Sequence, residues 1–138
     1  MESFSADWLA LREPADTAAR SESLTRLAGQ RLARRSHVRA IDLASGTGAN
    51  VRYLASRLPM PATWTLVDHD PALLEEARRR LAGGPLGDDY TLTARRADLS
   101  QLDAALVAGY DLVTASALLD LVSTAWLQRL ALACRGTG

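Results

Sequence analysis

Short apolar runs alternate with helical patterns along most of the chain. Four runs have the length and composition of buried strands, at 38–43, 64–68, 90–94 and 110–115. Apolar positions that recur every three or four residues predict helices at 48–58, 102–107 and 123–134, and from Pro71 to a Gly83-Gly84-Pro85 stop. Strands that alternate with helices predict a parallel sheet with right-handed crossovers.

The N-terminal 37 residues carry helical patterns without a strand. Apolar residues about one turn apart predict a helix over 3–11, which Pro14 ends or restarts. A second helix is predicted from Asp16, its N-cap, to about Arg35. The apolar stripe of this second helix is Leu24, Leu27, Ala28 and Leu32.

The length and composition suit one domain with a core. The chain has 138 residues, of which 48% are hydrophobic. A formal net charge of zero argues against a general nucleic-acid or membrane-surface binder. With no apolar run near the roughly 20 residues of a membrane span and no signal-peptide pattern, we expect a cytoplasmic protein. A single cysteine, Cys134, excludes an internal disulfide, and no metal-ligand spacing is present.

The segment 38–50 carries the strongest chemical signal. An apolar run ends in Asp42 and breaks into Ala44-Ser45-Gly46-Thr47-Gly48 before a helical pattern begins, which is the opening of a nucleotide-binding α/β unit. A dinucleotide loop needs a third glycine, which is missing, and Asp42 would repel a pyrophosphate. The acid suits a ligand that is cationic there, such as the amino group and sulfonium of S-adenosylmethionine.

Residues 42–48 resemble the first motif of class I S-adenosylmethionine-dependent methyltransferases, which reads acid-x-Gly-x-Gly-x-Gly. This chain carries alanine at the first glycine of that motif. The resemblance implies a Rossmann-like, three-layer α/β sandwich that binds S-adenosyl-L-methionine. It also implies cofactor contacts from Asp42, Ala44, Ser45, Gly46 and Gly48.

The second motif of the family is matched at the end of the second predicted strand. Asp68 lies about 20 residues after Gly48, the spacing of a ribose-binding acid, and a carboxylate can accept two hydroxyl hydrogens. His69 is expected along the adenine, although an exposed loop histidine fits equally. In this family N-terminal helices often cover the cofactor, so Arg20 is expected to reach the methionyl carboxylate; a solvated arginine is the alternative.

Two further stretches, 97–99 and 110–119, are similar to the third and fourth motifs. The resemblance implies that Asp98 accepts from the adenine amino group and that the Leu99 N–H meets a ring nitrogen. Asp98 also fits a loop acid or a helix cap. The fourth motif runs beneath the cofactor and adds Ser116 to the predicted contacts.

The resemblance implies in-line transfer of the sulfonium methyl group. Since the leaving group is already activated, catalysis can rest on positioning and desolvation, and no catalytic residue is assigned. Asp120 is the nearest candidate carboxylate. The Asn/Asp-Pro-Pro-aromatic signature of amino-methylating nucleic-acid enzymes is absent, and Ser116-Ala117-Leu118-Leu119 stands in its place, which favours a small-molecule methyl acceptor.

Other functions stay open at this point, because a fold does not fix a reaction. A non-catalytic cofactor-binding or interaction domain would bind the cofactor without methyl transfer. A dinucleotide oxidoreductase would bind NAD, against which the missing glycine and the acid argue. An aminopropyl transferase of the spermidine-synthase kind shares the fold.

Strand count sets an expectation about domain organisation. Residues 1–37 form a predicted helical cap region, and residues 38–138 a Rossmann-like cofactor-binding domain with strand order 3-2-1-4. The resembling family has seven strands in the order 3-2-1-4-5-7-6, so we expect the N-terminal portion of a longer protein, truncated before the fifth strand. The fourth strand would then be an open edge through which the chain self-associates.

Overall fold

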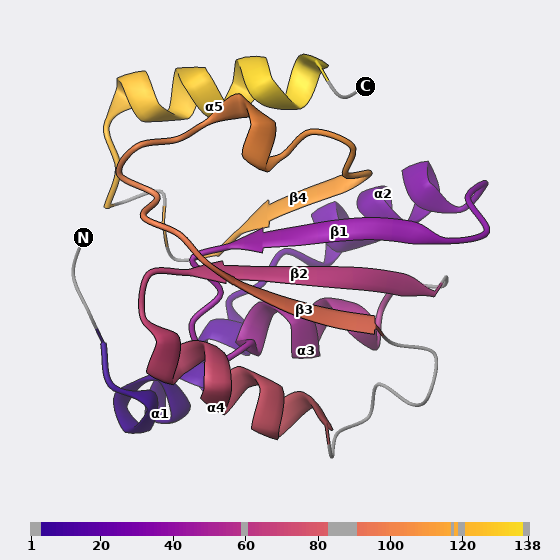
Figure 1. The fold of residues 1–138 in the computed structure, drawn as a ribbon. Coiled ribbons are helices and arrows are strands. Elements are labelled where there is room, and N and C mark those ends of the chain that lie inside the picture. Colours follow the sequence, from indigo (N-terminus) through magenta and orange to yellow (C-terminus); the bar gives the residue numbers. More distant parts are fainter. Residues whose placement is uncertain (1–3, 59–60, 83–90, 117, 119–120, 137–138) are drawn as a thin grey trace.

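The computed structural model of this chain contains one parallel sheet with helices on both faces (Figure 1). It describes residues 4–58, 61–82, 91–116, 118 and 121–136. The described strands are β1 (Val38–Leu43), β2 (Ala62–Asp68), β3 (Thr91–Arg96) and β4 (Leu112–Ala115). They pair in parallel in the order β3-β2-β1-β4. The predicted α/β fold and strand order 3-2-1-4 are therefore confirmed.

Two apolar layers hold the helices to the sheet. One face packs against α2 (Glu22–Leu32), α3 (Ala49–Ala55) and α4 (Pro71–Ala82), and the other against η1 (Ala104–Leu106) and α5 (Thr124–Gly136). Successive residues of a strand point to opposite faces, so β1 sends Ala40 into the first layer and Ile41 into the second. In the described part of the chain, no helix combines the length and apolar character that a membrane span requires.

The predicted elements of the sheet region are recovered with shifted ends. The strand predicted at 38–43 is confirmed, whereas α3 is shorter than the predicted helix and the helix predicted at 102–107 is a single 3₁₀ turn. Asp70 accepts the Ala72 N–H at 2.9 Å, as expected of a helix cap, and Ser123 accepts the Trp126 N–H at 3.1 Å. The predicted strand start at Tyr90 and the predicted helix stop at Gly83-Gly84-Pro85 lie outside the described residues.

The prediction that Pro14 ends or restarts the first helix is wrong. Helix α1 runs over Ala6–Ala18 with Pro14 inside it. A proline removes one N–H from the helical ladder, here the donor to the carbonyl of Ala10. Both residues are exposed, so water can take the place of the lost hydrogen bond.

The predicted start of the second helix is also wrong. Asp16 lies within α1, where its Oδ1 is 3.2 Å from Arg12 Nη2. Ser21 is the cap of α2, because its hydroxyl accepts the Leu24 N–H at 3.2 Å. The predicted apolar stripe is buried only at its end, since Leu24 is 65% exposed while Leu32 belongs to the core.

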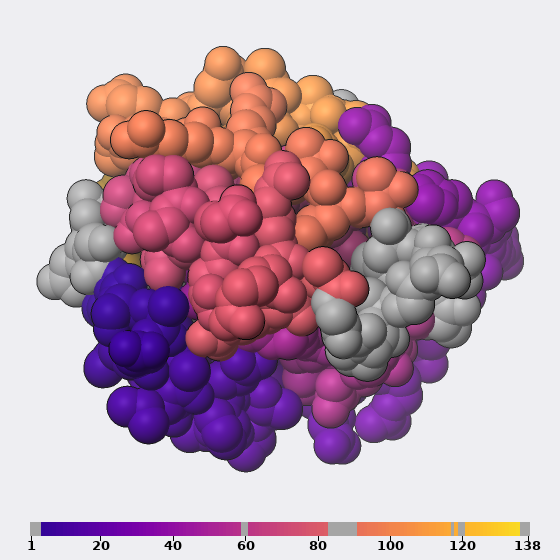
Figure 2. All heavy atoms as spheres, turned by 60° about the horizontal axis from the view of Figure 1, so that its bottom comes forward, coloured from indigo at the N-terminus to yellow at the C-terminus, as the bar shows by residue number. Residues whose placement is uncertain are grey.

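The strand register brings Asp42 close to residues of both neighbouring strands at one edge of the sheet. Asp42 of β1 lies opposite Leu66 of β2 and Thr114 of β4. In open parallel sheets, ligands bind beyond the carboxyl ends of the strands where the strand order reverses, which here is between β1 and β4. Helix α1 lies at the same end of the molecule, beside α4 (Figure 2).

Candidate functional site

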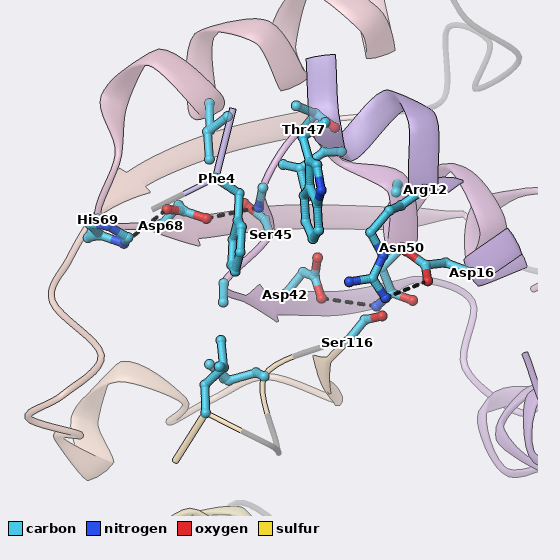
Figure 3. Close-up of a pocket in the computed structure, with 18 of the residues that line it drawn as sticks. Phe4, Arg12, Asp16, Asp42, Ser45, Thr47, Asn50, Asp68, His69 and Ser116 are labelled. Carbon is cyan, nitrogen blue, oxygen red and sulfur yellow. Dashed lines mark hydrogen bonds and ion pairs between the residues drawn. The ribbon is translucent and has the colours of Figure 1, made fainter. Parts of the chain in front are cut away.

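A cavity of about 500 Å³ opens at the carboxyl ends of β1 and β2 (Figure 3). This volume lies within the range of small-molecule sites. Its walls come from α1, the loop after β1, the ends of both strands and the segment after β4. The predicted cofactor contacts that line it are Asp42, Ala44, Ser45, Gly46, Asp68, His69 and Ser116.

Left-handed backbone shapes the loop between β1 and α3. Ala44 (φ 55°), Gly46 (φ 55°) and Gly48 (φ 85°) all adopt it. For alanine this conformation costs about 1–2 kcal/mol, so Ala44 is a strained member of the loop. Gly48 does not line the cavity; it is the N-cap of α3, and a Cβ there would lie 3.1 Å from Leu81 Cδ1.

Asp42 is the buried acid of the cavity, with 1% of its surface exposed. Asn50 Nδ2 donates to its Oδ1 at 3.0 Å, and Thr114 Oγ1 donates to the same oxygen at 2.7 Å. Oδ2 points into the cavity (Figure 3). Burial raises the pKa of Asp42 to about 6, against the lowering effects of the two hydrogen bonds and of nearby Arg20. A cationic group in the cavity would therefore stabilise this carboxylate.

Asp68, at the end of β2, is held by the main chain. The Gly46 N–H donates to its Oδ2 at 2.9 Å, and the Asp70 N–H donates to its Oδ1 at 3.1 Å. His69 Nδ1 lies 3.3 Å from the same Oδ1. The carboxylate thus joins the glycine loop to the end of β2 while lining the cavity (Figure 3).

Ser45 supplies an observation that points to a polar ligand. Its side chain is buried, and among the described residues no group forms a hydrogen bond with its hydroxyl. Buried polar atoms are rarely left without a partner. Because Ser45 lines the cavity, a ligand with polar groups can provide that partner.

Arg20 brings a positive charge beside the buried acid. It lies between α1 and α2, lines the cavity, and donates to Asn50 Oδ1. Asn50 in turn donates to Asp42, so one amide connects an arginine to a carboxylate. A cation next to an anion is an arrangement that suits a zwitterionic amino-acid group.

Helix α1 and Phe4, which precedes it, form the aromatic wall of the cavity. The rings of Phe4 and Trp8 stack with centroids 4.7 Å apart and an interplanar angle of 14°. The Arg12 guanidinium lies 4.9 Å from the Trp8 ring centroid. A Cβ added to Gly46 would meet Leu9 Cδ1 at 3.3 Å, so α1 packs directly against the glycine loop.

Besides Gly48, two predicted contacts lie away from this cavity. Asp98 is exposed, and its Oδ1 accepts the Ser100 N–H at 2.9 Å. Hydrogen bonding with the Ser100 side chain, and then with its backbone, holds the pKa of Asp98 below its ordinary value. It lines a second hollow that shares His69 with the cavity. The Leu99 side chain is buried, and its carbonyl accepts from Trp126 Nε1 at 2.5 Å. Asp120, the candidate carboxylate, lies outside the described residues.

Sequence reasoning missed several residues that line the cavity. Asn50 is 5% exposed on α3, and a polar residue on the apolar side of a predicted helix was the available signal. Trp8 and Arg12 are four residues apart and share a face of α1, and Phe4 precedes the Ser5 cap of that helix with the same spacing. That spacing indicates a common wall but not the element it packs against.

Comparison with known proteins gives a consistent result. Residues 40–137 match the family described as "Methyltransferase domain". No curated protein sequence matches significantly. Among solved structures, the sugar N-methyltransferase KedS8 from Streptoalloteichus sp ATCC 53650 is 24% identical with a TM-score of 0.64. The S-adenosylmethionine-dependent methyltransferase SibL in its apo form is 25% identical with a TM-score of 0.59.

The glycopeptide N-methyltransferase MtfA, complexed with S-adenosyl-L-methionine, is 23% identical with a TM-score of 0.58. The alignments with KedS8, SibL and MtfA cover 96%, 94% and 83% of this chain. They cover 49%, 33% and 48% of those chains. The chain therefore spans between a third and a half of the length of these structures.

Proposed function

Because the chain belongs to the methyltransferase-domain family, we propose that it binds S-adenosyl-L-methionine in the cavity described above and directs methyl transfer to a small molecule. The observation that carries the proposal is the joint lining of one cavity by Asp42, Asp68 and the Ser45 hydroxyl, which has no hydrogen-bond partner among the residues that the structure describes. These groups are chemically suited to a ligand with a cationic centre and a hydroxylated sugar.

Each polar part of the cofactor has a proposed partner. Asp42 faces the amino group and sulfonium through Oδ2, and Arg20 faces the methionyl carboxylate. Asp68 accepts from the ribose hydroxyls with the lone pairs that its main-chain partners leave free. Because His69 lines both hollows, the adenine is proposed on its side, toward Asp98 and the Leu99 N–H.

The residues of the chain act by binding, orienting and excluding water. The cofactor supplies a methyl group already activated by a sulfonium. Asp42 and Arg20 fix the amino-acid end, while the aromatic wall of α1 and Leu118 restrict water. No proton acceptor is assigned, because positioning and desolvation can supply much of the acceleration for an activated leaving group.

A small-molecule acceptor is supported by the cavity and by the sequence after β4. The cavity lies under α1, and the lining residues that are not assigned to the cofactor are mainly apolar and aromatic. The segment 116–119 reads Ser-Ala-Leu-Leu and lacks the proline-aromatic pattern of amino-methylating nucleic-acid enzymes. Zero net charge also gives nucleic acid no electrostatic attraction.

Calorimetric titration with S-adenosylhomocysteine, with NAD as the control ligand, tests cofactor binding. We expect saturable binding of S-adenosylhomocysteine and none of NAD. Binding of NAD alone would contradict the proposal. Incubation with methyl-labelled S-adenosylmethionine and separate pools of small molecules, nucleic acid and protein tests the acceptor. Label in either macromolecular pool, and none in the small-molecule pool, would overturn that part.

A further inference from the structure

One arginine connects α1 to the glycine loop. Arg52 Nε donates to Glu13 Oε1 at 2.8 Å and Nη2 donates to Glu13 Oε2 at 2.7 Å, a two-pronged pair between α3 and α1. Its third nitrogen, Nη1, donates to the carbonyl of Thr47 at 2.6 Å. All three arms of the guanidinium are thus engaged, two with a cavity wall and one with the glycine loop.

This pair is less exposed than two other ion pairs of α1 and α4. The side chains of Arg52 and Glu13 are 17% and 25% exposed, whereas Arg12 and Arg79 are 49% and 71% exposed in their pairs; the Arg80–Glu76 pair of α4 is as little exposed as Arg52–Glu13. Partial burial and bidentate geometry strengthen such a pair. Arg52 also holds the pKa of Glu13 below its ordinary value, so the carboxylate is ionised at neutral pH.

Apolar burial alone does not fix α1 in place. Across Ala6–Ala18, all of which the structure describes, no side chain is fully buried. Helices of this length owe their stability mainly to tertiary packing. The contact of Leu9 with the glycine loop and the pair between Glu13 and Arg52 therefore carry an unusual share of the docking.

We propose that Glu13 and Arg52 are positioning residues that hold α1 against the glycine loop, so that they determine how long the cofactor stays in the cavity. The inference rests on the proposed function for its ligand. It assigns a role to two residues that do not line the cavity. Loosening the pair lowers the fraction of molecules whose cavity wall is in place, and the apparent affinity falls by that fraction.

The position of α1 is measured first without ligand. Labelling with 5-fluorotryptophan gives one ¹⁹F signal for each of the three tryptophans, and Trp8→Phe assigns the signal of α1. In Glu13→Gln we expect a larger solvent-isotope shift and a narrower line for Trp8. The signals of Trp64 and Trp126, both buried in the core, should stay unchanged. A general loss of stability would move all three.

Cofactor residence is measured second, by stopped-flow and calorimetric binding of S-adenosylhomocysteine. We expect Glu13→Gln to weaken binding about tenfold, mainly through faster dissociation. Arg52→Lys keeps the positive charge but loses the bidentate geometry of the guanidinium. Its affinity should therefore lie between those of the wild type and Arg52→Gln. Glu76→Gln is the matched control, because Glu76 is likewise a helix carboxylate paired with arginine, here Arg79 and Arg80, but does not line the cavity.

The outcomes separate this inference from the proposed function. An unchanged Trp8 signal in both Glu13→Gln and Arg52→Gln would overturn the positioning role. Tighter binding in Glu13→Gln would also overturn it, since the pair would then oppose the cofactor. Absence of binding by the wild type would count against the proposed function alone, because the ligand-free Trp8 signal still tests the position of α1.

Discussion

Two aspartates end neighbouring strands, yet the chain holds them in different ways. Asp42 is held by the side chains of Asn50 and Thr114, and both bind the same oxygen. Asp68 is held by main-chain N–H groups, one on each oxygen. The first carboxylate therefore keeps one oxygen for the cavity, and its removal spares the backbone. The second is part of the frame of the loop, so its removal affects structure and binding together.

The largest effect is expected from Asp68→Ala, which removes the acceptor of two main-chain donors and the proposed ribose partner. We expect affinity for S-adenosylhomocysteine to fall roughly 100-fold or more and the free energy of unfolding to drop by about 2–4 kcal/mol. Calorimetry and urea unfolding measure the two quantities.

Asp103→Ala is the control for this experiment. Asp103 also accepts the N–H of the residue two positions later, but it lies away from the cavity. The Asp103→Ala substitution should lower the free energy of unfolding by at most about 1 kcal/mol and leave the affinity for S-adenosylhomocysteine unchanged. Equal losses in both variants would show that Asp68 has no special part in binding.

Asp42→Asn should separate binding from stability. The amide oxygen can keep the hydrogen bonds from Asn50 and Thr114, while an NH₂ group replaces Oδ2 in the cavity. We expect affinity to fall about 10- to 100-fold. At pH 8 the free energy of unfolding should rise by about 1–3 kcal/mol, because a costly buried charge is gone. Wild-type affinity in this variant would contradict the role given to Asp42.

The pH dependence of the wild type should show the same acid acting in opposite directions on stability and binding. The folded pKa of Asp42 is about 6 and its ordinary value is 3.8. Its stabilising contribution is full below the ordinary value and is lost as pH rises through about 6, a change of about 3 kcal/mol.

Affinity should instead rise with pH up to about 6, since the ionised form faces the cationic ligand, and fall about tenfold per unit below it. Binding titrations and unfolding experiments at roughly pH 4.5 to 8 measure both trends. Arg20 and Asp68 also influence this carboxylate, so Asp42→Asn is the baseline to subtract. If the affinity of Asp42→Asn has the same pH profile as that of the wild type, Asp42 is not the titrating group.

The smallest effect is expected from Thr114→Val, which removes the 2.7 Å hydrogen bond to Asp42 at nearly constant volume. That hydrogen bond lowers the pKa of Asp42, so its loss should move the midpoint of the affinity profile upward. At pH 7 we expect affinity to fall about two- to fivefold. Thr93→Val, at an exposed position of β3, is the control and should leave the midpoint in place.

The central strand was predictable because burial on both faces leaves a continuous apolar run. Val38–Leu43 therefore has the same bounds in the sequence pattern and in the structure. The boundary between α1 and α2 was not predictable in this way. Asp16 and Ser21 are both good caps, and only their contacts, with Arg12 and with the Leu24 N–H, decide between them.

The motif residues of the cavity could be placed from strand ends and spacing, whereas its N-terminal wall could not. Asp42 and Asp68 lie near the ends of apolar strands, and the carboxyl ends of parallel strands meet at one edge. Whether Trp8 and Asn50 line the cavity depends on how α1 docks and on which side of α3 faces the cavity. Periodicity predicts that a helix has an apolar face, but not its partner.

The docking of α1 also has a consequence for the order of folding. Its pair with α3 joins residues 39 positions apart, and β1 and the glycine loop lie between them in the chain. Contacts of that separation form late, after the elements that they join. We therefore expect α1 to dock after β1 and α3 have assembled, although it precedes them in the chain.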